Sequence, residues 1–169
     1  MTPHPTPPVL SVPGATAELA GRLTDGLERV DALLREVVDH DDPFIAKASG
    51  HLVEAGGKRF RPLLTLLAAE LGGGINDDVV QAAAGVELTH LASLYHDDVM
   101  DEAQLRRGVP AANVVYGNST AILVGDLLFG KASELVAGLG AEAVLIQAQP
   151  HEGLCLDCLL YTSPSPRDS

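Results

Sequence analysis

The spacing of apolar residues limits the possible folds of this chain more than any other feature of its sequence. Across residues 15–40 they recur every three or four positions, as they do along one face of an α-helix. Further stretches rich in Leu, Ala and Val follow at 44–54, 63–71, 77–101 and 120–139. No stretch of useful length alternates with the period of a β-strand. The pattern therefore predicts an all-α protein whose helices are buried over much of their surface.

Capping residues, glycines and prolines predict where several of these helices begin and end. Asn76 precedes two aspartates and is a good N-cap for the fourth helix. The segment 108–117 contains two glycines and a proline and is expected to be a connection, after which Asn118 or Ser119 caps the next helix. Pro150 removes a backbone donor and is expected to break any helix that reaches it.

The charge balance and the start of the chain narrow the class of protein. The 169 residues suffice for one domain, and 23 acidic residues against 11 Lys and Arg give a formal net charge of −12, which argues against nucleic-acid binding. No apolar stretch reaches the length of a membrane span. Residues 1–14 are rich in proline and lack the features of a signal peptide, so we expect a disordered leader and a cytoplasmic location.

Four acidic residues are concentrated near the end of the fourth predicted helix, in the stretch "HDDVMDEAQLRRG". Asp97 and Asp101 are four residues apart, so on a helix their side chains share one face, and Asp98 and Glu102 form a second such pair. Like charges at this spacing repel, and the helix dipole is also negative there. A divalent cation reverses both effects, and carboxylates without Cys or paired His favour Mg²⁺ over Zn²⁺. The alternative is a solvated acidic helix end, but the two arginines at 106–107 are well placed to grip phosphate oxygens.

Basic residues also occur in a glycine-containing loop. In "GGKRFRP" they are Lys58, Arg59 and Arg61, and the segment is not a Walker A loop, because Leu52 stands where its first glycine belongs. Three cations at a helix start favour an anion-binding site, with a basic surface loop as the alternative. His90 lies about two helical turns before the acidic cluster, on much the same face.

Three segments, in this order and spacing, resemble the trans-isoprenyl diphosphate synthases, which form the polyprenyl synthetase family: "GGKRFRP", "ELTHLASLYHDDVMDEAQLRRG" and "GNSTAILVGDLLF". The resemblance extends over roughly residues 15–156. It implies an isoprenoid-synthase-type helical bundle, usually a homodimer, with Mg²⁺ as its cofactor. It also implies the head-to-tail condensation of isopentenyl diphosphate with an allylic diphosphate.

By position, the resemblance assigns roles to the charged residues of these segments. The residues that it implies for catalysis are Asp97, Asp98, Asp101 and Arg106; the three aspartates are the implied Mg²⁺ ligands, and Arg106 holds the allylic diphosphate. The residues that it implies for binding isopentenyl diphosphate are Lys58, Arg61, His90 and Arg107. As the allylic C–O bond breaks, negative charge builds on the leaving diphosphate, where Mg²⁺ and arginine stabilise it.

The resemblance also bears on product length, through the two residues about one turn before the first aspartate, Ala92 and Ser93. In this family, bulky aromatic residues at these positions resemble the short-chain synthases. Two small residues therefore imply a product longer than farnesyl diphosphate, with a quinone side chain as one candidate use.

The last part of the chain departs from the family. A second aspartate-rich motif and a Lys-Thr pair, which the family uses, are absent, and residues 157–169 do not resemble it. We therefore expect a truncated bundle over 15–156, a disordered or foreign tail at 157–169, and no measurable prenyltransferase activity of the chain as written. Two other functions stay open. A class I terpene cyclase shares the D-D-x-x-D chemistry but does not need the "GGKRFRP" loop, and a non-catalytic synthase subunit would not need the intact aspartates.

Overall fold

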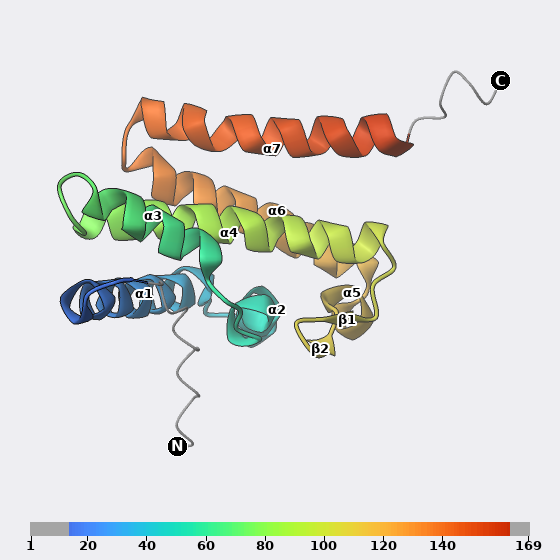
Figure 1. Ribbon diagram of the computed structural model, residues 1–169. Coiled ribbons are helices and arrows are strands. Elements are labelled where there is room, and N and C mark those ends of the chain that lie inside the picture. The colour runs from blue at the N-terminus through green and yellow to red at the C-terminus, as the bar shows by residue number, and fades with distance from the viewer. Residues whose placement is uncertain (1–13, 163–169) are drawn as a thin grey trace, which may run out of the picture.

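The computed structural model describes residues 14–162, and most of them lie in α-helices (Figure 1). The helices are α1 Ala17–Val38, α2 Pro43–Glu54, α3 Phe60–Glu70, α4 Asp77–Met100, α5 Ala112–Tyr116, α6 Asn118–Ala137 and α7 Ala141–Thr162. Two short strands, β1 Leu105–Arg106 and β2 Val109–Pro110, pair as an antiparallel hairpin between α4 and α5. The all-α prediction is confirmed. Residues 1–13 of the predicted leader and 163–169 of the predicted tail lie outside the described residues.

Helix α4 is the central helix of the bundle (Figure 1). It packs along α6 and also contacts α1 and α3, while α7 lies against α6. The close approach of α4 and α6 requires Gly125, because a Cβ atom there would overlap with the His96 ring and lie 3.2 Å from the carbonyl oxygen of Ala92. The main apolar core lies around α4 and receives buried side chains from α1, α2, α5 and α6.

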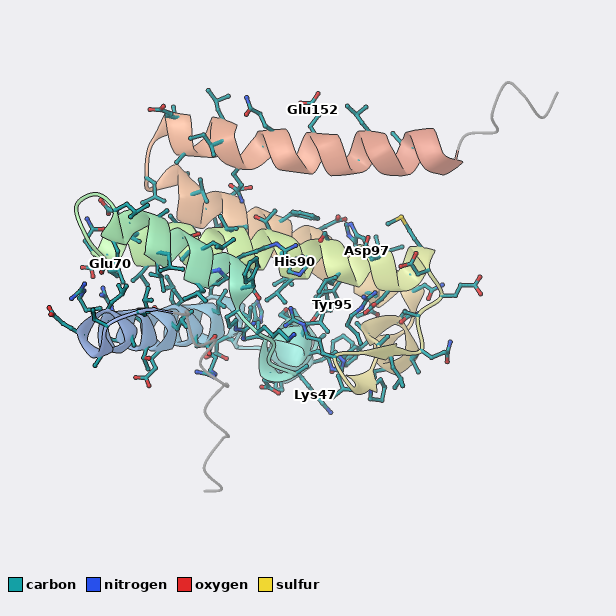
Figure 2. The ribbon with its side chains drawn as sticks, viewed as in Figure 1. Lys47, Glu70, His90, Tyr95, Asp97 and Glu152 are labelled. Atoms are coloured by element: carbon teal, nitrogen blue, oxygen red, sulfur yellow. The ribbon has the colours of Figure 1, made fainter. Side chains whose placement is uncertain are left out.

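Tyr95 fixes the position of α2 against α4. Its ring is fully buried between the two helices, and its hydroxyl donates to the carbonyl oxygen of Ala48 at 2.6 Å and accepts from the backbone nitrogen of Leu52 at 3.4 Å (Figure 2). Burial raises the pKa of Tyr95, so the hydroxyl keeps its proton and remains a donor. Because α2 leads directly into the glycine-containing loop, this contact also positions that loop.

The predicted N-caps of α4 and α6 have different outcomes. The Asn76 cap is confirmed, since its side chain accepts a hydrogen bond from the backbone nitrogen of Val79 at 2.9 Å. The predicted cap of α6 at Asn118 or Ser119 is wrong. Gly117, with a φ of 85°, turns the chain one residue earlier, and α6 begins at Asn118 itself without a side-chain cap.

Two further segments contain more regular structure than the sequence predicts. The segment 108–117, expected to be a connection, contains β2 and α5. Pro150 lies inside α7, so the expected helix break does not occur. A proline fits the helical φ and removes one donor, so the helix continues on the hydrogen bonds of the flanking turns. None of the helices in residues 14–162 is long and apolar enough to cross a membrane.

Candidate functional site

The C-terminal end of α4 presents Asp97 and Asp101, as the sequence predicts. Asp97 lies in the last turn, and Asp101 is the C-cap residue, whose backbone nitrogen donates to the carbonyl oxygen of Asp97 at 2.8 Å. Burial, followed by the charge of the Asp101 carboxylate, raises the pKa of Asp97 above its ordinary value. A cation near these two side chains would relieve the repulsion between them.

The donor set fits a magnesium ion that keeps most of its shell for other ligands. Within residues 14–162, no three Asp, Glu, His or Cys side chains converge to hold a metal ion. Mg²⁺ is commonly held by one or two carboxylates and completes its shell with water and substrate phosphates. The pair Asp97 and Asp101 therefore suits Mg²⁺ in the presence of a phosphate ligand, without a third protein side chain.

Asp98, which the sequence also predicts to be a metal ligand, has its side chain directed to Arg106. Its side chain is fully buried, and Oδ1 accepts a hydrogen bond from Arg106 Nε at 2.6 Å. Oδ2 has no hydrogen-bond partner among the described residues. One residue corresponds to a rotation of about 100° around a helix, which turns Asp98 inward where Asp97 is partly exposed. Asp98 thus holds the guanidinium of Arg106 in place.

A tight hairpin sends Arg106 and Arg107 in different directions. Arg107 and Gly108 form its turn, and both have positive φ, 53° and 82°, as in the primed turns that join antiparallel strands. Arg106 lies on β1 opposite Val109 and pairs with Asp98, whereas Arg107 reaches the loop before α3. The hairpin was not expected from the sequence, because Arg-Gly is not one of the residue pairs that favour such a turn, although Gly108 readily adopts its positive φ.

Arg107 is held by the glycine-containing loop. Its Nη1 donates to the carbonyl oxygens of Leu52, at 3.3 Å, and Gly56, and its Nη2 lies 3.7 Å from Glu87 Oε1. The guanidinium covers Gly57, where a Cβ atom would lie 2.8 Å from Nη1. The second glycine of "GGKRFRP" is therefore needed both for space and for its φ of 153°.

Arg59, the middle cation of the same loop, has a structural role. It is buried, and its φ of 48° is left-handed. Its Nε lies 2.7 Å from Asp31 Oδ1, its Nη1 lies 3.1 Å from Glu87 Oε1, and its Nη2 donates to the carbonyl oxygen of Val53 at 3.1 Å. It ties the loop to α1, α2 and α4, while Lys58 stays exposed. Asp31 and Glu87 escape sequence-based prediction, although each is an acid on an otherwise apolar helix face.

The charges of three arginines act on the ring of His90. This residue lies on α4, and Asp97 lies nearer the C-terminal end of the same helix (Figure 2). Burial, followed by the charges of Arg61, Arg107 and Arg106, lowers the pKa of His90 to about 4. The charges of three arginines that the sequence predicts to bind diphosphate thus act on His90. At neutral pH the ring is neutral, and the positive charges of the arginines that act on it favour an anion.

Binding of a diphosphate is expected to raise the pKa of His90, because a polyanion offsets the charge of the three arginines. In the free protein, the fold should lose stability as the pH falls from 6.5 toward about 4, since the unfolded chain then binds a proton that the folded ring refuses. NMR titration of the ring signals, assigned with His90→Gln, measures the pKa with and without inorganic diphosphate. An unchanged midpoint would place the anion elsewhere.

An apolar cavity of about 530 Å³ lies between α4, α6 and α7, with Arg61 and His90 among its lining residues. The α4 wall of the cavity also includes Val86, Thr89 and Ser93. The opposite wall comes from α6 and α7, through Val136, Ala143, Ile146 and Gln147. Arg61 and His90 therefore border the apolar space directly.

Only one of the two residues predicted to control product length lines this cavity. Ser93 does, whereas Ala92 is fully buried in the interface of α4 with α6, where its carbonyl oxygen faces Gly125. The helical rotation between adjacent residues places one in the cavity and the other in the core. The sequence analysis missed Thr89, one turn earlier, which accepts a hydrogen bond from Gln147 Nε2 of α7 at 2.7 Å.

The helical bundle that holds these residues has counterparts in known proteins. The model of the polyprenyl synthetase family matches residues 42–156, and the chain belongs to this family. The solved structures that resemble it confirm the isoprenoid-synthase type of helical fold.

Individual relatives are prenyl diphosphate synthases that differ in their named products. The chain is 48% identical over 145 residues to the nonaprenyl diphosphate synthase of Mycobacterium tuberculosis. The aligned segment covers 85% of this chain and 43% of the relative. It is 40% identical over 145 residues to the geranylgeranyl diphosphate synthase of Methanosarcina mazei, again covering 85% of this chain and 43% of the relative. The structure of the geranylgeranyl pyrophosphate synthase of Corynebacterium glutamicum, complexed with calcium and isoprenyl diphosphate, matches with a TM-score of 0.78 and 41% identity, over 94% of this chain and 48% of that one. The chain thus spans less than half the length of these relatives.

Proposed function

We propose that this chain takes part in the head-to-tail condensation of isopentenyl diphosphate with an allylic diphosphate, in a Mg²⁺-dependent trans-prenyltransferase. The observation that carries the proposal is the apolar cavity lined by Arg61 and His90. The pKa of this histidine is lowered by burial and then by the charges of Arg61, Arg107 and Arg106. Membership of the family supports prenyl chain elongation. The calcium and isoprenyl diphosphate complex of the C. glutamicum relative supports a divalent cation next to the substrate.

Arg106, Asp97 and Asp101 are proposed to hold the allylic diphosphate. Mg²⁺ at the aspartate pair would supply Lewis-acid stabilisation of the leaving oxygens. Asp98 fixes Arg106 through Nε at 2.6 Å, which leaves its two terminal nitrogens for phosphate oxygens. When the allylic C–O bond breaks, its electron pair leaves with the diphosphate, and Arg106 stabilises the charge that develops there.

Lys58, Arg61, His90 and Arg107 are proposed to hold isopentenyl diphosphate with its double bond facing the allylic cation. The double bond attacks that cation to form the new C–C bond. Transfer of a proton from the adjacent carbon to the released diphosphate then restores a double bond. A neutral His90 donates a hydrogen bond without adding charge near the cation. Apolar side chains such as Val86 keep water away from it.

A chimera tests this function directly. The segment of this chain that matches the M. tuberculosis nonaprenyl diphosphate synthase replaces the equivalent segment of that enzyme. Turnover of isopentenyl diphosphate with an allylic primer, dependent on a divalent cation, is the expected result. Calorimetric binding of isopentenyl diphosphate to the 169-residue chain with Mg²⁺ is the matching experiment on the chain itself. A chimera that folds like its parent but fails to elongate would contradict the proposal.

The apolar cavity is proposed to receive the growing prenyl chain, and its small Ser93 to permit products longer than farnesyl diphosphate. Replacing Ser93 with phenylalanine in the chimera is therefore expected to shorten the main product by at least one isoprene unit, because the ring fills the cavity. Chromatography of the dephosphorylated products measures this. Ser93→Ala is the matched control and should leave product length unchanged. An unaltered product from Ser93→Phe would show that the chain grows elsewhere.

A second copy of this chain is proposed to cover an apolar surface on α5 and α6, giving a homodimer. The exposed side chains there are Val114, Val115, Ile122, Leu123 and Leu127. Leu123 alone leaves 67% of its surface exposed. Several large apolar side chains exposed on two neighbouring helices are typical of an interaction site. The cytoplasmic location remains a prediction from the sequence.

A further inference from the structure

Two acids and two arginines form a buried charge cluster beneath the candidate diphosphate site: Asp31, Arg59, Glu87 and Arg107. Asp31 comes from α1, Arg59 from the glycine-containing loop, Glu87 from α4 and Arg107 from the hairpin turn. Their formal charges sum to zero, which makes such burial tolerable. Only Arg107 of the four has a part in the proposed mechanism, so the other three need a separate explanation.

Glu87 is the member that joins the two arginines. Its Oε1 lies 3.1 Å from Arg59 Nη1 and 3.7 Å from Arg107 Nη2. Asp31, by contrast, pairs with Arg59 alone among the described residues. Glu87 is buried, with 3% of its side chain exposed, so solvent does not compete for this oxygen. Loss of Glu87 would therefore affect Arg107 directly, whereas loss of Asp31 would not.

The protein engages two of the three guanidinium nitrogens of Arg107. Nη1 is taken by the carbonyl oxygens of Leu52 and Gly56, and Nη2 faces Glu87. Within residues 14–162, Nε of Arg107 makes no hydrogen bond, so this nitrogen can donate to a phosphate oxygen. A guanidinium held by two nitrogens has lost most of its rotational freedom before an anion arrives.

We propose that Glu87 is a positioning residue, which holds Arg107 in the orientation that binds the diphosphate of isopentenyl diphosphate. The inference rests on the proposed function. Arg59 has the supporting part, since it supplies the second cation at Glu87 and links this carboxylate to Asp31 of α1.

Positioning and simple electrostatics predict opposite results when Glu87 loses its charge. By Coulomb's law alone, removing a negative charge beside a cationic site should tighten the binding of an anion. If Glu87 orients Arg107, the same change should weaken binding, because the freed guanidinium must be ordered again at each binding event. The sign of the change in affinity therefore separates the two explanations.

The experiment measures the dissociation constant of the 169-residue chain for isopentenyl diphosphate with Mg²⁺, by calorimetry at constant ionic strength. Glu87→Gln is expected to weaken binding about tenfold or more, the loss of one charge-assisted contact. Asp31→Asn is the matched control: it removes the same charge from Arg59, should lower the melting temperature similarly, and should change affinity less than about threefold. Glu87→Asp keeps the charge but withdraws the carboxylate from Arg107, and it should also weaken binding. This variant provides the test if Glu87→Gln fails to fold.

The NMR titration of His90 gives a second readout. Because Arg107 is one of the cations that lower the pKa of His90, a guanidinium that swings away in Glu87→Gln should raise that pKa. Unchanged or tighter binding, or equal weakening by Asp31→Asn, would overturn the positioning role while leaving the proposed function intact. Absence of binding by the unaltered chain would instead count against the proposed function itself.

Discussion

Replacing Arg59 with methionine is expected to lower the free energy of unfolding by about 3–5 kcal/mol, the usual cost of removing one partner of a buried ion pair. Methionine keeps the apolar length of the side chain but leaves Asp31 without its cation and Glu87 with Arg107 alone, at 3.7 Å. The total free energy of unfolding of most domains is only about 5–15 kcal/mol, so the variant should be close to unfolding. Urea denaturation followed by circular dichroism measures the difference.

Arg22 provides the matched control for this prediction. Like Arg59 it has two acidic partners, Glu18 and Glu70, but it lies at the surface. Replacing Arg22 with methionine should therefore shift the urea midpoint far less, because water solvates the acids that remain. Equal losses from the two variants would show that burial of the Arg59 contacts adds nothing to stability.

Replacing Asp97 with asparagine is expected to reduce turnover by the chimera at least about a hundredfold, because the leaving diphosphate loses part of its metal clamp. The same change should stabilise the metal-free fold, since the raised pKa of Asp97 reports burial of its charge and repulsion from Asp101. Turnover and melting temperature are therefore expected to change in opposite directions. Mg²⁺ with diphosphate should raise the melting temperature of the unaltered protein more than that of the variant.

The control for Asp97 is another acid of the same helix. Asp78 is exposed in the first turn of α4, where the helix dipole favours a negative charge. Asp78→Asn should leave turnover unchanged and should not stabilise the fold. If Asp97→Asn retains the turnover of the unaltered chimera, the metal pair must lie elsewhere.

The helices and the aspartate pair follow from short-range patterns, which is why the sequence predicts them well. The Asn76 cap depends on residues within a single turn. Asp97 and Asp101 are four residues apart, so their neighbourhood follows from helix geometry alone. The apolar period of α1 similarly requires no knowledge of its partners.

The partners of the basic residues do not follow from such patterns. Arg59 contacts Asp31 and Glu87, each 28 residues away along the chain. The three cations of "GGKRFRP" look equivalent in the sequence, and only the packing of α1, α2 and α4 buries the middle one. Ala92 and Ser93 separate for the same reason, because the contact of α4 with α6 decides which of two neighbours faces the cavity.

The contact between Gly57 and Arg107 restricts how this sequence can diverge over evolutionary time. Any side chain at position 57 would displace the guanidinium, since even a Cβ atom would lie 2.8 Å from Nη1. A mutation of Gly57 therefore strains the backbone at its φ of 153° and moves the guanidinium of Arg107. The two positions are therefore expected to change together among descendants, so that a side chain at position 57 marks a protein in which this arginine has another orientation.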